Sequence, residues 1–128
     1  MKLEILNDLS NLINNNSITE KLNLIDKLVE LKEYKEAYFK LAVILEFINI
    51  SFSIKILNVD LKNSTIITFC NIYLKYDEKL ANKMIAVNAD YNLASEDISS
   101  INIDDVEYLA ATIYDIYEYM ITNYKSFL

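Results

Sequence analysis

The 128-residue sequence contains neither glycine nor proline, and this limits its backbone more than any other feature. Glycine is the usual residue in two-residue hairpin turns, and proline stiffens many loops. Without them, we expect helices joined by short polar links. Asparagine tolerates the left-handed conformation better than most residues do, so the fifteen asparagines should take over positions where glycine usually ends a helix.

The longest apolar stretch, residues 32–57, predicts a central helix. Its apolar residues recur at spacings of three and four, and charged residues fall on the opposite side. The apolar series is Leu41, Ile44, Leu45, Ile48, Phe52 and Ile56. With 53% hydrophobic residues, the chain can bury a core without a disulfide or a metal ion. We therefore expect a single all-α domain over residues 1–128, built as a bundle of about five helices.

Two shorter helices should precede this central one. Residues 2–14 carry apolar side chains on one helical face, and the asparagines at 14–16 end the pattern. Ser17 and Glu20 then have the form of a capping box, in which each side chain bonds the backbone amide of the other. This predicts the start of a second helix that reaches about Leu31.

Residues 50–73 fit two interpretations. Ile50, Phe52, Ile54 and Ile56 alternate with polar residues, which is typical of a half-buried strand and would give an α+β fold with a β-hairpin. Helical spacing nevertheless continues through Phe69, Tyr73 and Met84. We favour a fourth helix from about Thr65 to Asn92, broken near Asp77, and a polar link over residues 94–101.

The boundaries of the last helix are well marked. Asn102 is the predicted N-cap, because acidic residues fill the first turn, where carboxylates favour the positive end of the helix dipole. The inward side should carry Val106, Leu109, Ile113, Ile116, Tyr117, Met120, Tyr124 and Phe127. The outward side should carry Asp104, Tyr108, Ala111, Asp115, Glu118, Tyr119 and Thr122.

One segment resembles a tetratricopeptide-type helical hairpin over about one repeat. In LVELKEYKEAYFKLAVI, Tyr34 lies three residues before the small residue Ala37, and Leu41 follows four residues later. The sequence departs from the family pattern at Ile25 and Ile44, where small residues are expected. Asn49 also stands where proline usually closes the repeat. The resemblance implies a helical hairpin and a protein-binding role.

The residue types argue against catalysis and against a cofactor or metal site. There is no histidine to act as a base or metal ligand, and no glycine for a phosphate-binding loop. The carboxylate pairs 77–78, 96–97 and 104–105 are adjacent in sequence, so their side chains point in different directions on a helix. Cys70, the single cysteine, lies on an apolar stripe and is expected to be a core thiol.

The residue types also predict the cellular compartment of the protein. A lone cysteine cannot form an intramolecular disulfide, which suits a reducing compartment. Glu4 and Asp8 interrupt the apolar residues at the start of the sequence, which has no small-residue cleavage pattern, so we expect no signal peptide. The stretch 41–57 is long enough for a short membrane span, but Glu46, Asn49 and Lys55 would be costly in lipid. We expect a cytoplasmic protein that does not cross a membrane.

Charge is distributed unevenly along the chain. Residues 1–83 are neutral overall, whereas residues 84–128 hold eight acidic residues and one lysine. Five of the ten tyrosines also lie between residues 108 and 124. This acidic region would repel nucleic acid but suits a protein partner with a basic surface. The predicted binding residues are Asp104, Tyr108, Asp115, Glu118 and Tyr119.

Two functions fit this surface. In character, as a small, acidic chain without catalytic groups, the protein resembles toxin-immunity proteins and phage anti-defence or anti-CRISPR inhibitors. These proteins block a basic site on a partner. The alternative is a helical adaptor or subunit of a larger assembly, in which a neighbour or a second copy covers surplus apolar surface and a homodimer would form.

Overall fold

The computed structural model describes residues 3–62 and 64–128, and this part of the chain forms six α-helices and no β-strand. The prediction of an all-α bundle is confirmed, with one helix more than expected. The helices are α1 (Glu4–Ile13), α2 (Asn16–Glu30), α3 (Tyr34–Phe52), α4 (Ile66–Tyr73), α5 (Glu78–Glu96) and α6 (Ile103–Asn123). Short helical turns follow three of them: η1 (Ser53–Leu57), η2 (Ile98–Ser100) and η3 (Lys125–Phe127).

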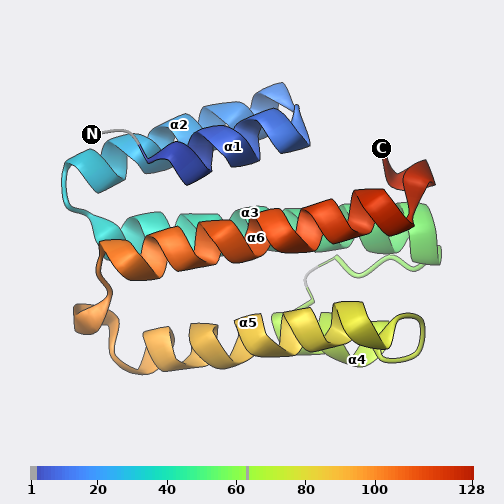
Figure 1. Cartoon of the computed structure of the whole chain (residues 1–128). Helices are drawn as coiled ribbons and strands as arrows, with labels where there is room; N and C mark the ends of the chain where they lie inside the picture. The colour runs from blue at the N-terminus through green and yellow to red at the C-terminus, as the bar shows by residue number, and fades with distance from the viewer. Residues whose placement is uncertain (1–2, 63) are drawn as a thin grey trace.

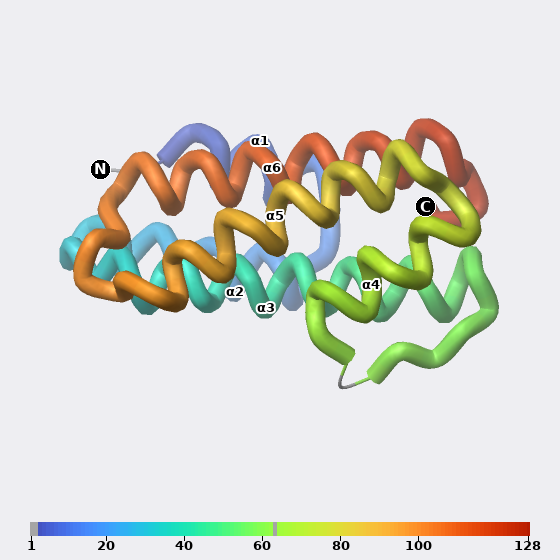
Figure 2. Tube along the Cα trace, turned by 90° about the horizontal axis from the view of Figure 1, so that it is seen from below, coloured from blue at the N-terminus to red at the C-terminus, as the bar shows by residue number. Residues whose placement is uncertain are grey.

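The six helices lie in three layers of two (Figure 1). Helices α1 and α2 form one outer layer, α4 and α5 form the other, and α3 and α6 lie between them. The view from below shows α5 crossing over the middle layer, with α4 beside it (Figure 2). Although far apart in sequence, α3 and α6 contact each other and run in the same direction (Figure 1).

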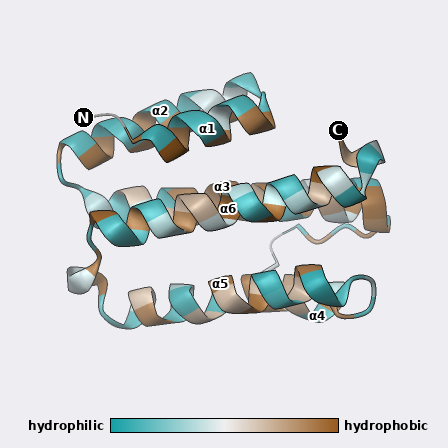
Figure 3. Ribbon diagram, in the orientation of Figure 1, coloured by the Kyte–Doolittle hydropathy of each residue, from teal (hydrophilic) through white to brown (hydrophobic). Residues whose placement is uncertain are grey.

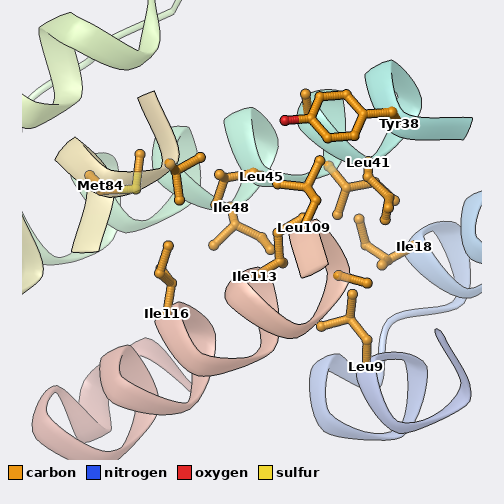
Figure 4. Close-up of a cluster of buried hydrophobic side chains, with 14 of the residues drawn as sticks. Leu9, Ile18, Tyr38, Leu41, Leu45, Ile48, Met84, Leu109, Ile113 and Ile116 are labelled. Atoms are coloured by element: carbon orange, nitrogen blue, oxygen red, sulfur yellow. The ribbon is translucent and has the colours of Figure 1, made fainter. Parts of the chain in front are cut away.

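The core lies between the layers and is built from the apolar stripes of the sequence. Leu41, Leu45 and Ile48 of α3 are buried, as predicted. They face Leu109 and Ile113 of α6 (Figure 4). Such interdigitated apolar side chains supply most of the stability of a helical bundle.

The alternative β-hairpin at residues 50–73 is wrong. The alternating residues lie on the last turn of α3 and on η1, a π-helical turn. The wider turn leaves Ile54 exposed and Ile56 half-buried, so the alternation does not separate core from solvent. Asn58 ends this turn in the left-handed conformation, with φ of 60°. Its amide donates to the carbonyl of Ser53.

Asparagine replaces glycine at two of the three left-handed positions among the described residues. Asn14 (φ 50°) ends α1, and Asn58 ends η1. The third is Lys32 (φ 61°), which follows α2. There the amides of Lys32 and Glu33 donate to the carbonyls of Val29 and Leu28, the paired bonds of a Schellman cap.

The predicted capping box at residues 17–20 is also wrong. The N-cap of α2 is Asn15, whose side chain accepts a hydrogen bond from the amide of Ile18 at 3.1 Å. Asparagine caps helices as well as serine does. Starting the helix earlier also places Ile18 in the core, where it is buried. Ser17 therefore lies within the first turn.

A buried polar contact joins three helices. Asn49 of α3 is fully buried, and its Oδ1 accepts a hydrogen bond from the Tyr73 hydroxyl of α4 at 2.7 Å. Its Nδ2 lies 3.7 Å from the sulfur of Met84 on α5. Satisfying each polar group in this way fixes how α4 and α5 sit on α3. Cys70 is buried nearby on α4, as expected for a core thiol.

Hydrophobic and hydrophilic residues alternate along every helix (Figure 3). None of the helices in residues 3–62 and 64–128 is long and apolar enough to cross a membrane. The break predicted near Asp77 is present between α4 and α5. The predicted link at 94–101 is shorter than expected, because α5 extends to Glu96 and η2 follows.

Candidate protein-binding surface

The start of α6 is fixed by a capping box. The Asn102 side chain accepts hydrogen bonds from the amides of Asp104 and Asp105, and the Asp105 carboxylate accepts one from the amide of Asn102. This reciprocal arrangement satisfies the first free amides of the helix. It confirms Asn102 as the predicted N-cap of α6.

The outward face of α6 carries four of the five predicted binding residues. Asp104, Tyr108, Asp115 and Glu118 are exposed, and the side chain of Tyr108 retains 59% of its accessible surface. Helix α6 holds five acidic residues and no lysine or arginine. An exposed aromatic ring among carboxylates is therefore the main feature of this face.

Tyr119, the fifth predicted residue, is half-buried and not free on the outward face. Its hydroxyl donates to both carboxylate oxygens of Asp77, at 3.0 and 3.1 Å. The ammonium groups of Lys79 and Lys83 lie 5.9 and 5.6 Å from the centre of its ring, within range for cation–π attraction. Tyr119 thus joins α6 to the start of α5.

Asp77 is the centre of this contact. It caps α5 by accepting a hydrogen bond from the amide of Leu80, and it accepts a short one, 2.6 Å, from the Tyr124 hydroxyl. Burial acts to raise the pKa of Asp77, but the bonds from Tyr124, Leu80 and Tyr119 outweigh it, so the pKa lies below its usual value. The sequence predicted a helix break near Asp77, but nothing in it indicated the bonds from the two tyrosines.

Asp115 is exposed but paired. Its Oδ2 lies 2.6 Å from the ammonium group of Lys83 on α5. An exposed ion pair contributes little stability, but it cancels charge locally. Asp104 and Glu107 form no ion pair within residues 3–62 and 64–128. The unbalanced negative charge therefore concentrates at the first half of α6.

Two hollows flank Tyr108 along the seam between α5 and α6. One, of about 290 Å³, is lined by Lys83, Ala86, Ala111 and Asp115 as well as Tyr108. The other lies towards the start of α6, where Tyr38, Asp90 and Asp105 line it together with Tyr108. Tyr108 is thus a ridge between two depressions, which is a suitable shape for contact with a second protein surface.

A separate groove of about 520 Å³ lies between α3, α4 and α5, and both apolar and polar side chains line it, with Glu46 and Asn88 among the polar ones. Phe39 and Val43 of α3 line it together with Ile67 of α4. The Phe39 ring contacts Tyr91 edge-on, with centroids 5.7 Å apart. Val43 and Ile67 are more than half exposed, so the groove leaves apolar surface in contact with water.

The structure brings together no group of three metal-binding side chains within residues 3–62 and 64–128. Two of the three adjacent carboxylate pairs lie at helix starts, because Asp77 caps α5 and Asp105 belongs to the cap of α6, whereas Glu96 and Asp97 lie at the end of α5. The chain matches no protein-family model, no curated protein sequence and no solved structure. The resemblances to tetratricopeptide hairpins and to immunity proteins therefore stay predictions.

Proposed function

We propose that the protein is a non-enzymatic binding protein that blocks a basic site on a partner protein, as immunity and anti-defence inhibitors do. The observation that carries this proposal is Tyr108, which stands exposed between two hollows at the acidic half of α6. Tyrosine is enriched at binding hot spots because its ring buries a large area and its hydroxyl forms a hydrogen bond. The surrounding carboxylates would speed association with a basic surface.

The contacts that the five predicted residues make within the chain indicate which of them are free to bind a partner. Asp115 is neutralised by Lys83, and Tyr119 is engaged with Asp77. Of the five predicted residues, Asp104 and Tyr108 are therefore best placed for a partner, and Glu118 contributes at the edge. Glu107, which was not among the predicted binding residues, is exposed beside them.

Affinity capture from cells that produce the protein tests this proposal. The wild type is compared with Tyr108→Ala and with the double variant Asp104→Lys/Glu107→Lys. The matched control is Glu4→Lys/Asp8→Lys, which changes the net charge equally at another exposed helix start. We expect a basic protein to be retained by the wild type and the control and lost by both α6 variants. Equal capture by all four proteins would refute this surface.

The second candidate function is that of a structural subunit, and the exposed apolar side chains of Val43 and Ile67 in the groove between α3, α4 and α5 favour it. In that case the groove is covered by a second copy or by a larger assembly. Light scattering after size-exclusion chromatography separates the two functions. A stable dimer that Val43→Glu converts into a monomer supports the structural role, whereas a monomeric wild type that retains the basic partner supports inhibition.

A further inference from the structure

The second hollow beside Tyr108 is a small acidic pocket of about 210 Å³. We call it the Tyr38 pocket. It lies where α3, α5 and the start of α6 meet, and Tyr38, Asp90, Leu93, Asp105 and Tyr108 contribute to its walls. No lysine or arginine lines it. Its volume is below the range of about 300–1,000 Å³ that is usual for drug-sized ligands, so it suits a single side chain.

The Tyr38 hydroxyl is the unusual group in this pocket. Tyr38 is only 4% exposed, yet its hydroxyl has no hydrogen-bond partner among residues 3–62 and 64–128. The hydroxyl oxygen itself is open to solvent, because no side-chain nitrogen or oxygen among the described residues is both buried and without a partner. The ring packs at the border of the core beside Leu41 (Figure 4), and the polar end belongs to the pocket wall.

Two carboxylates face this hydroxyl. Burial, together with the negative charges of Asp90 and Asp105 and a smaller effect of Tyr91, raises the pKa of Tyr38 to about 12. Tyr38 is therefore a neutral phenol at physiological pH. Asp90 is half-buried and forms no hydrogen bond or ion pair within the described residues. Two unbalanced carboxylates beside a hydroxyl that bonds no described residue attract a cation that can donate several hydrogen bonds.

The walls define the kind of cation. Leu93 and the exposed ring of Tyr108 provide apolar surface at the side of the pocket. They would pack against an unbranched aliphatic chain and, for Tyr108, attract its charged end through cation–π contact. Calcium takes six to eight oxygen ligands, more than two carboxylates and one phenol supply. A primary ammonium has three donors, which match the three acceptors present.

We propose that the Tyr38 pocket binds a lysine side chain of the protein partner. The aliphatic stem would lie against Leu93 and Tyr108, and the ammonium group would donate to Asp90, Asp105 and the Tyr38 hydroxyl. This proposal rests on the proposed protein-binding function and names the residue of the partner that enters the acidic face. A surface lysine on a basic partner then becomes the anchor of the complex.

A small probe tests the pocket without any partner. Nα-acetyl-lysine methylamide is titrated into the isotope-labelled protein, and backbone amide shifts are followed by NMR. The control probe is Nα-acetyl-norleucine methylamide, which keeps the stem and lacks the ammonium. We expect saturable shifts at Leu93 and Asp105 with millimolar affinity for the lysine probe only. Absence of saturation, or equal shifts with norleucine, would overturn the proposal.

Two variants assign the effect to the named groups. Asp90→Asn should weaken the lysine probe by about fivefold or more, because a charged hydrogen bond is lost. Glu96→Gln removes an exposed acid of α5 that does not line the pocket and should change the affinity by less than about twofold. Equal weakening by both would indicate general charge attraction and would contradict a specific site.

Tyr38→Phe gives a second readout. It removes only the hydroxyl, which bonds no described residue and can bond water in the pocket, so the thermal midpoint should stay nearly the same. The lysine probe should nevertheless bind a few-fold more weakly. A lower midpoint together with unchanged probe affinity would assign Tyr38 a purely structural role and refute its part in the pocket.

Different experimental results would refute the lysine pocket and the protein-binding function. If Asp90→Asn leaves both the probe and the captured partner unaffected, the pocket proposal fails and the docking surface stands. If the probe binds but no basic protein is captured, the pocket stands as an amine site and the inhibitor function fails.

Discussion

Asp77 should be the most important surface carboxylate for stability, and the size of its contribution follows from its contacts. It caps α5 and accepts hydrogen bonds from Tyr119 and Tyr124. Replacing an N-cap by alanine costs about 1 kcal/mol. Hydrogen bonds to a charged group contribute about 1.5–3 kcal/mol each, but both tyrosines are partly exposed and can bond water instead. We therefore expect Asp77→Ala to cost about 2–4 kcal/mol.

The contribution of Asp77 to the free energy of unfolding should fall as the pH is lowered. The hydrogen bonds hold the pKa of Asp77 below its usual value of 3.8 in the folded protein, so protonation favours the unfolded chain. The contribution is complete above the unfolded pKa and is lost as the pH falls through the lower folded pKa. Asp77→Asn keeps an oxygen that can cap the helix but has no charge to lose. The stability difference between the wild type and Asp77→Asn should shrink between about pH 5 and pH 2.

Urea unfolding followed by circular dichroism measures both effects. Asp8→Ala is the control, because Asp8 is an exposed carboxylate on α1 and its removal should change the stability by no more than about 0.5 kcal/mol. If Asp77→Ala is no more destabilising than Asp8→Ala, the hydrogen bonds to Tyr119 and Tyr124 do not stabilise the fold. A difference between wild type and Asp77→Asn that is independent of pH would show that the charge has no role.

Two further stability predictions come from α3 and from the end of α2. Leu45 is fully buried, so Leu45→Ala should cost about 2–5 kcal/mol in urea unfolding. Val43 is 55% exposed, so the control Val43→Ala should cost far less. Equal urea midpoints for the two variants would contradict the central position of α3. Lys32 has a positive φ of 61°, which is unfavourable for a residue with a Cβ, so Lys32→Gly should raise the stability by about 0.5–1 kcal/mol. Lys27→Gly, inside α2, should lower it by a similar amount, and a loss of stability in both glycine variants would contradict the assigned strain.

The fold was largely predictable because apolar spacing is a local property. The stripes of α3 and α6 identify the core residues, and the acids after Asn102 mark where α6 begins. Capping was less predictable, because Asn15 and Ser17 are both good N-cap residues, and the local sequence does not specify which of them caps α2. The π-helical turn after α3 has no sequence signal that distinguishes it from an ordinary helix end.

The candidate site was less predictable than the fold, because it depends on which helices become neighbours. The 100° spacing places Tyr119 and Asp115 on the outer side of α6 when that helix is considered alone. In the folded chain the start of α5 lies beside them, so Asp77 engages Tyr119 and Lys83 neutralises Asp115. The Tyr38 pocket likewise combines residues from three helices and has no signature in any one of them.

The parallel placement of α3 and α6 has a consequence for synthesis of the chain on the ribosome. Helix α3 is made well before α6, but its apolar face packs on α6, whose residues 103–123 follow only after α4 and α5. Until they emerge, Leu41, Leu45 and Ile48 are exposed on the nascent chain, a state prone to aggregation or chaperone binding. A long interval before the central contacts form also slows folding, compared with a bundle of sequential hairpins. Nascent chains that stop before residue 103 should therefore bind chaperones strongly, and completion of α6 should release them.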